Sequence, residues 1–274
     1  MSRDAVSSLG SPQGLAASHD RLPNYAVLRV TFAALWIVWA AMLFGGFFFG
    51  ELNSSQTHHV PGWCRMGSSL VLTIAGWLGA VLLVRTPSAR YTLLIAIGMT
   101  LGFLGDLFNA DWIPGGALAG MIAFGIGHLA YIVGCLNLRR VARLLAVTPL
   151  KVSLIAWELF ALAGWFFVVW MGTKNLPLRI PALPYCLLLA GTAGFTGGLA
   201  WQSRSLIGLG LGGALFLISD LILAFPMFRG SFYLSGDAVW LTYGPGQMFI
   251  VYSIPAAARL CQWAFGNETG RGTA

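Results

Sequence analysis

Residues 205–226 read SLIGLGLGGALFLISDLILAFP, an apolar run in which Asp220 is the only charged residue. A helix that is apolar on all sides belongs either in the core of a large protein or in a lipid bilayer. About 20 such residues in an α-helix cross a hydrocarbon core that is about 30 Å thick. This stretch therefore predicts a transmembrane helix that carries one carboxyl group.

Seven further segments meet the same criteria of length and apolarity. Together with 205–226 they are residues 25–49, 67–85, 91–110, 116–138, 150–171, 180–201 and 238–261. Short connections rich in Pro, Gly and polar residues separate them, as turns do. We therefore expect an all-α fold: a polytopic membrane protein built as an eight-transmembrane-helix bundle over residues 25–261.

The two ends of the chain differ from this membrane domain. Residues 1–24 are rich in Ser, Gly, Ala and Pro and lack the apolar core of a cleaved signal peptide. We expect a flexible cytoplasmic tail there, and a short C-terminal tail over residues 262–274.

The overall composition agrees with a membrane protein and excludes several other classes. Hydrophobic residues make up 57% of the chain and charged residues only 9%, against about 25% in a soluble domain. The net charge of +7 comes from basic residues at the ends of apolar runs rather than from a basic stripe with aromatics. Nucleic acid is therefore not an expected partner. The four cysteines form no C-x-x-C pair. We expect Cys135, Cys186 and Cys261 to be packing residues and Cys64, in a loop, to be dispensable.

The distribution of Lys and Arg predicts the orientation of the bundle. Four basic residues lie on the side opposite the tail: Arg65, Lys174, Arg179 and Arg229. Twelve lie on the tail side: Arg3, Arg21, Arg29, Arg85, Arg90, Arg139, Arg140, Arg143, Lys151, Arg204, Arg259 and Arg271. Because cytoplasmic loops carry an excess of Lys and Arg, we expect a multipass protein of the cell membrane with both termini in the cytoplasm.

Four ionisable residues lie inside the predicted spans: Asp106, His128, Glu158 and Asp220. Such residues are costly in lipid and usually face the bundle interior or an aqueous cavity. At 1.5 Å of rise per residue, Asp106 and Asp220 each lie about 22 Å from the cytoplasmic end, and His128 about 18 Å from the other end. These depths predict one shared cavity. The plainer alternatives are an interfacial carboxylate for Asp106 and a backbone-bonded imidazole for His128; Glu158 is in no motif.

Four short motifs follow one another in the last two thirds of the chain. They are Gly105-Asp106, the helix from Phe124 through His128 to Tyr131, Ser219-Asp220, and Tyr243-Gly244-Pro245-Gly246-Gln247. In this order, over roughly residues 91–255, the chain resembles the YhhN-like lysoplasmalogenases. Two features depart from the pattern: Gly246 stands where relatives more often carry Ala, and the first long loop with His58 and His59 has no counterpart.

The resemblance implies a multipass hydrolase of the vinyl-ether bond of lysoplasmalogens. The lysophospholipid substrate would yield a fatty aldehyde and glycerophospho-ethanolamine or -choline, with membrane lipid as the surroundings and no cofactor. Vinyl-ether hydrolysis begins with proton transfer to the β-carbon and ends with capture of the oxocarbenium ion by water, which calls for positioned acid and base groups. On this basis we expect Asp220 to be the general acid, Asp106 to stabilise the cation and His128 to hold the water. The remaining motif residues are expected to orient these three or bind substrate: Phe124, Tyr131, Ser219, Tyr243 and Gln247.

Two other functions use the same residues. Asp106, His128 and Asp220 are possible ligands of a divalent metal with an open position for water, as in metal-dependent lipid hydrolases. Alternatively, a proton-coupled carrier or lipid-binding protein would use the carboxylates as a relay. The absence of an internal repeat and of paired helix-breaking prolines speaks against a carrier with inverted repeats. The sequence assigns no oligomeric state.

Overall fold

The computed structural model describes residues 25–269, and this part of the chain is helical with no strand. The helices are α2 (Tyr25–Phe49), α3 (Gly62–Leu82), α4 (Ala89–Asn109), α5 (Gly116–Val141), α6 (Val147–Gly164), α7 (Arg179–Gln202), α8 (Ile207–Phe228), α9 (Ser235–Val251) and α10 (Ile254–Thr269). Short helical turns are η1 (Trp165–Trp170, a π-helix), η2 (Leu176–Leu178) and η3 (Arg204–Leu206).

The described residues contain eight helical stretches long and apolar enough to cross a membrane. The predicted all-α, eight-span architecture is confirmed, and the chain is a multipass membrane protein. The tail predicted over residues 1–24 lies outside the described residues.

The eighth predicted segment, 238–261, consists of two helices in the structure. α9 ends at Val251 and α10 begins at Ile254. Pro255, the second residue of α10, has no N–H to continue the hydrogen-bond ladder of α9, so the chain turns just before it. Ser253 holds this turn, because its hydroxyl donates to the Ile250 carbonyl and pairs with the Tyr91 hydroxyl at 2.6 Å. α10 then continues to Thr269, past the end predicted at residue 261.

The start of the second predicted segment also differs from the structure. α3 begins at Gly62 rather than at residue 67, so Arg65 lies in its first turn instead of in a loop. The charged side chain of Arg65 therefore lies on a helix, at one end of the bundle, and faces the bundle interior.

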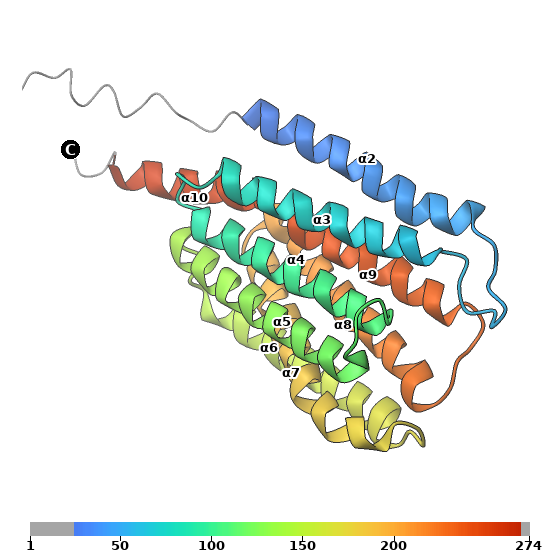
Figure 1. The fold of residues 1–274 in the computed structure, drawn as a ribbon. Helices are drawn as coiled ribbons and strands as arrows, with labels where there is room; N and C mark the ends of the chain where they lie inside the picture. Colours follow the sequence, from blue (N-terminus) through green and yellow to red (C-terminus); the bar gives the residue numbers. More distant parts are fainter. Residues whose placement is uncertain (1–24, 270–274) are drawn as a thin grey trace, which may run out of the picture.

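From α2 to α5 and from α6 to α9, each helix packs against the next one and runs antiparallel to it (Figure 1). Contacts of α5 with α7 and of α3 with α9 join helices that are not consecutive. α2 packs along α3 at one margin of the bundle, and α6 packs mainly on α7. The loops 50–61, 110–115 and 229–234 all lie at the end of the bundle opposite Tyr25, which we call the distal end.

Small residues let the helix backbones approach closely, as helix packing in lipid requires. A Cβ at Gly198 would lie 2.8 Å from the Cα of Leu150, which places α7 directly on α6. A Cβ at Gly212 would lie 2.9 Å from the Gly246 carbonyl oxygen, which places α8 directly on α9. Such positions accept only glycine without a shift of backbone.

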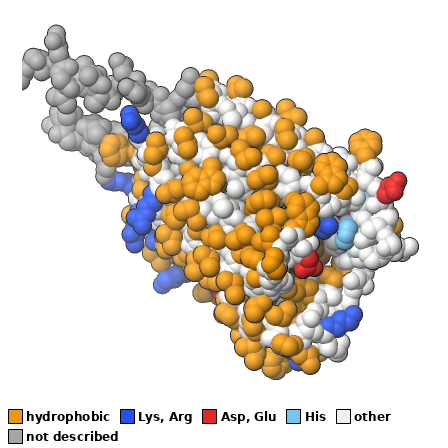
Figure 2. All heavy atoms as spheres, in the orientation of Figure 1, with side chains coloured by type: hydrophobic (Ala, Val, Ile, Leu, Met, Phe, Trp, Pro, Cys, Tyr) orange, Lys and Arg blue, Asp and Glu red, His pale blue; other side chains and the backbone are white. Residues whose placement is uncertain are grey.

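The lateral surface matches a lipid environment. Large apolar side chains such as Phe49, Ile180 and Val30 are exposed on it, and Figure 2 shows hydrophobic side chains covering the face in view. Lys and Arg side chains gather at the end from which α2 starts (Figure 2). This face therefore shows the gathering of basic side chains at one end that the sequence pattern predicted.

Candidate active site

A cavity of about 260 Å³ opens into the bundle at the distal end, between α3, α4, α8 and α9. We call it the polar chamber. Its lining includes Arg65 on α3, Asp106 on α4, Asp220 on α8, and Trp240 and Tyr243 on α9. The two carboxyl groups that the sequence placed at similar depths therefore face one cavity. They are also close enough to interact electrostatically.

Neutral donors surround the Asp106 carboxyl group, which is buried. The Ser69 hydroxyl donates to Asp106 Oδ2 at 2.6 Å, and the Tyr243 hydroxyl forms a second hydrogen bond with this carboxyl. The Gln247 amide donates in turn to the Tyr243 hydroxyl. Among the described residues, no Lys, Arg or His forms an ion pair with Asp106 within 4.0 Å. Hydrogen bonds from α3 and α9, rather than a salt bridge, fix this side chain.

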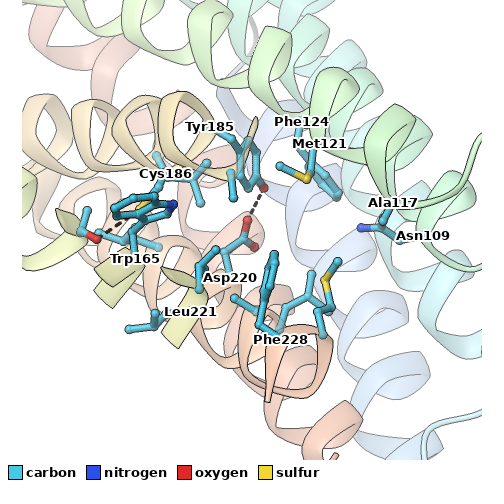
Figure 3. Close-up of a pocket in the computed structure, with 18 of the residues that line it drawn as sticks. Asn109, Ala117, Met121, Phe124, Trp165, Tyr185, Cys186, Asp220, Leu221 and Phe228 are labelled. Carbon is cyan, nitrogen blue, oxygen red and sulfur yellow. Dashed lines mark hydrogen bonds between the residues drawn. The ribbon is translucent and has the colours of Figure 1, made fainter. Parts of the chain in front are cut away.

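Asp220 has a different partner and a different exposure. The Tyr185 hydroxyl on α7 donates to Asp220 Oδ2, as Figure 3 shows. The neighbouring Ser219 hydroxyl donates to the Phe216 carbonyl at 2.7 Å and also interacts with the Asp220 carboxyl. Asp220 is only partly buried and lines two cavities, the polar chamber and a second one described next.

The second cavity is smaller, about 70 Å³, and mostly apolar. We call it the apolar chamber. It lies between α5, α6, α7 and α8, and Figure 3 shows Met121, Trp165 and Phe228 on its walls. Trp165 belongs to the π-helical turn η1, a kind of helix defect that occurs frequently at functional sites. The two chambers share four lining residues: Asn109, Phe124, Asp220 and Leu223. Asp220 therefore lies where the polar and apolar chambers meet.

Glycine on α4 sets the position of the Phe124 ring at this junction. A Cβ at Gly105 would lie 2.6 Å from the ring of Phe124. The ring packs edge-on against Phe216 and Tyr243, with centroid distances of 6.1 and 6.0 Å. The two residues of the Gly105-Asp106 pair thus have separate roles. The glycine leaves room for the Phe124 ring, and the aspartate lines the cavity.

His128 is buried but lines neither chamber. Its Nδ1 lies 3.0 Å from the Thr192 hydroxyl, with which it forms a hydrogen bond, and the Thr192 hydroxyl also lies 3.2 Å from the Leu188 carbonyl. The imidazole packs on Phe216, with ring centroids 4.5 Å apart. Its Nε2 has no hydrogen-bond partner among the described residues. The shared cavity predicted for three residues therefore contains the two aspartates and not the histidine.

Of the other predicted binding residues, some line the polar chamber and some do not. Phe124 and Tyr243 line the polar chamber, whereas Tyr131, Ser219 and Gln247 are buried behind its walls. The Tyr131 ring packs against Gly98 on α4, and Gln247 reaches the chamber only through Tyr243. These three side chains support the lining rather than form it.

Glu158, which lies in no sequence motif, is half-buried on α6. Its carboxyl oxygen lies near Gly191 on α7, 3.8 Å from where a Cβ would be. It lines neither chamber, so the structure assigns it no part in the site.

Several residues of the site were not predicted from the sequence. Ser69 and Tyr185 are the hydrogen-bond partners of the two aspartates, and Arg65 and Trp240 line the polar chamber. Ser and Tyr are common in membrane helices, so their types alone carry little signal. The contacts that give them a role join different helices and are visible only in three dimensions.

The loop 50–61 is tied to the start of α9 beside the polar chamber. Asp237 accepts hydrogen bonds from the backbone N–H groups of His59 at 2.7 Å and Val60 at 3.1 Å, and pairs with His59 Nδ1 at 3.0 Å. His58 lines the chamber. Burial, aided by the nearby charge of Arg65, lowers the pKa of His58, with Asp237 acting in the opposite direction.

The three side chains that the sequence suggested as metal ligands do not come together in the structure. Among the described residues, no group of three His, Cys, Asp or Glu side chains is arranged to hold a metal ion. His128 is outside the chamber that Asp106 and Asp220 line. The three ligands proposed from the sequence therefore do not converge on one point.

Comparison with known proteins identifies a family that the chain matches. The model of a family described as the YhhN family matches residues 63–254. This range extends from the first turn of α3 to the start of α10 and includes both aspartates and Tyr243. No curated protein and no solved structure gives a significant match.

Proposed function

The chain belongs to the YhhN family, and from this membership and the paired carboxyl groups we propose that it hydrolyses the vinyl-ether bond of lysoplasmalogens. The products are a fatty aldehyde and a glycerophospho-headgroup. One observation carries the proposal beyond family membership: Asp106 and Asp220 line one polar cavity, and Asp220 also faces the adjoining apolar chamber.

The two chambers suit the two halves of such a substrate. The alkenyl chain enters the apolar chamber from the lipid, where the exposed side chain of Phe160 forms part of the wall. The glycerophospho-headgroup occupies the polar chamber. The vinyl ether, which joins these halves, then lies at the junction beside Asp220 and the Phe124 ring.

The chemistry needs one proton donor, one water molecule and stabilisation of a cation. The protonated carboxyl of Asp220 transfers its proton to the β-carbon of the double bond, which leaves an oxocarbenium ion. The Asp106 carboxylate stabilises this cation and takes a proton from the water that attacks the α-carbon. The resulting hemiacetal collapses when the glycerol oxygen receives a proton and leaves, and the hydroxyl proton returns to the carboxyl pair. Two carboxyl groups in one cavity can share a proton in this way, because their mutual repulsion disfavours a double negative charge.

The remaining residues act by positioning these groups. Ser69 and Tyr243 orient the Asp106 carboxyl, and Tyr185 orients that of Asp220. His128 supports the aromatic wall through Phe216, which replaces the water-holding role expected from the sequence. No metal or organic cofactor enters this mechanism.

We further propose that the protein lies in the cell membrane with both termini in the cytoplasm. The excess of Lys and Arg at the end from which α2 starts supports this orientation. The polar chamber would then open on the non-cytoplasmic side.

Purified protein in lipid nanodiscs, incubated with an alkenyl lysophospholipid, tests the proposed function. We expect release of fatty aldehyde from the vinyl-ether lipid and none from the matched lysophospholipid with a saturated ether. The variant Asp220→Asn should be inactive, while Glu158→Gln should retain activity because Glu158 lines neither chamber. Absence of aldehyde with the wild-type protein would favour a lipid-binding or carrier function.

A further inference from the structure

The polar chamber contains one strongly basic side chain. Among the described residues that line it, Arg65 is the only Arg or Lys. The guanidinium group lies over the Trp240 ring, 5.9 Å from its centroid. It is also close enough to Asp106 for an electrostatic interaction. A fixed positive charge therefore faces the same space as the two carboxyl groups.

The acidic groups nearest to Arg65 have other partners. Asp237 accepts hydrogen bonds from His59 and Val60. Asp106 is bonded to Ser69 and Tyr243. No carboxylate lies within 4.0 Å of the Arg65 guanidinium among the described residues.

One nitrogen of the guanidinium group has no hydrogen-bond partner among the described residues. Arg65 Nε is buried and has no hydrogen-bond partner in the described part of the chain. A charged group that is partly withdrawn from water and lacks a counter-ion is costly to the folded state. The site is therefore complementary to an anion that is delivered from outside the protein.

The groups around Arg65 indicate which kind of anion fits the site. Arg65 shares the distal wall of the chamber with polar groups from two loops, among them Thr57, His58, Ser231 and Ser235. The planar guanidinium offers paired N–H donors, which match two oxygens of a phosphate group. The opposite, apolar chamber has no basic lining residue among those described. An amphiphile with a phosphate at one end and a hydrocarbon chain at the other fits this distribution of charge.

We propose that Arg65 binds the phosphate group of the lysolipid headgroup and so fixes the depth at which the ether bond stops in the cavity. This inference rests on the proposed function for the identity of the lipid. With the phosphate held at Arg65 and the chain in the apolar chamber, the glycerol and its ether oxygen lie between them, beside Asp106 and Asp220. Arg65 is thus a specificity-determining residue for phosphate-bearing lysolipids.

Equilibrium binding tests the site without turnover. The ligands are a radiolabelled 1-O-alkyl-lysophosphatidylethanolamine, whose saturated ether cannot be hydrolysed by this chemistry, and the matching 1-O-alkylglycerol, which has no phosphate. The proteins, all in nanodiscs, are wild type, Arg65→Gln, Arg65→Lys and Arg179→Gln. Arg179 is a matched control, because it also lies over a tryptophan ring, that of Trp170, but lines neither chamber.

We expect Arg65→Gln to weaken binding of the phosphate ligand by about 10- to 100-fold, the usual effect of losing a charge-assisted hydrogen-bonded pair. Binding of the alkylglycerol should not change, Arg65→Lys should retain part of the affinity, and Arg179→Gln should resemble wild type. Equal losses for both ligands, or no loss for either, would overturn the proposal. If inorganic phosphate bound at Arg65 as tightly as the lysolipid, the assignment to a lipid headgroup would also be overturned. Since neither lipid reacts, a failure here is distinct from a failure to release aldehyde.

Discussion

Asp106 and Asp220 come from α4 and α8 and line one cavity, although neither forms an ion pair with a Lys, Arg or His within 4.0 Å among the described residues. Each is instead bonded to neutral hydroxyl groups, Ser69 and Tyr243 for one and Tyr185 for the other. In a structural salt bridge, a basic side chain would compensate the negative charge of each aspartate. Two carboxyl groups held by hydroxyls beside an apolar chamber are suited to transferring protons.

The hydroxyl of Tyr185 should matter for turnover more than for substrate binding. Tyr185→Phe removes the donor to Asp220 and keeps the ring. Because this donor stabilises the negative charge that Asp220 gains as it gives up its proton, we expect kcat to fall by roughly tenfold or more, with little change in KM. Tyr252→Phe is the control, because it removes a comparable part-buried hydrogen bond, to the Phe32 carbonyl, away from both chambers. Steady-state aldehyde release measures both. Equal effects of the two substitutions would mean that Tyr185 is only structural.

The glycine beneath Phe124 should be required for the junction between the chambers. Gly105→Ala places a Cβ 2.6 Å from that ring, and overpacking of this kind costs about 1–3 kcal/mol. We expect a lower melting temperature in nanodiscs and, at a temperature where the variant is folded, a reduced rate because the ring is displaced. Gly45→Ala on α2, where no atom lies within 4 Å of the new Cβ, should behave like wild type. An active, fully stable Gly105→Ala variant would show that the position of Phe124 is not important.

Much of this architecture could be predicted from the sequence because lipid imposes strong rules. Runs of apolar residues predicted all eight spans. The cost of burying charge led to the prediction that Asp106, His128 and Asp220 share a cavity, and the two aspartates line one cavity in the structure. The eighth span was predicted as one helix because its apolar run is continuous, although Pro255 breaks it.

The placement of His128 shows what the sequence could not determine. A rise of 1.5 Å per residue gives depth along a helix but not the direction in which a side chain points. His128 lies on α5 and points toward Thr192 on α7, whereas the cavity lies on the side of α4, α8 and α9. For the same reason, the partners Ser69, Tyr185 and Arg65 were not predicted, since helix rotation and cross-helix contacts decide which polar residues meet.

Aldehyde release should not depend on a divalent metal. The mechanism uses only carboxyl groups and water, so activity after prolonged treatment with a strong chelator should equal that of untreated protein. The measurement compares chelated protein with and without added Zn²⁺, Mn²⁺ or Mg²⁺. Loss of activity on chelation that a single metal restores would support the metal-dependent alternative instead.

Acid should destabilise the distal loop through His58. The Asn53 amide donates to His58 Nε2 at 3.1 Å, and burial together with the Arg65 charge lowers the pKa of His58 from 6.5, while Asp237 raises it. A lowered pKa means that the folded state favours neutral His58, so this contribution to stability is complete above pH 6.5 and is lost as the pH falls below that value.

Glutamine at position 58 isolates this effect because it does not titrate and can still form hydrogen bonds. We expect the melting temperature of wild type, relative to that of His58→Gln, to fall as the pH is lowered from 7.5 to about 5. All other residues are the same in both proteins, so the difference reports the change at position 58. A difference that does not vary with pH would show that His58 is not held in its neutral form.

The most direct test of the central claim is a double-substitution cycle on the two aspartates. Initial rates of aldehyde release are measured for wild type, Asp106→Asn, Asp220→Asn and the double variant, with melting temperatures to confirm that each is folded. If the pair acts as one unit, each single substitution should lower the rate by about 10²–10⁴-fold, and the double variant should be little slower than the worse single variant. Independent effects that multiply in the double variant, or substantial activity in Asp220→Asn, would contradict the shared acid-base mechanism.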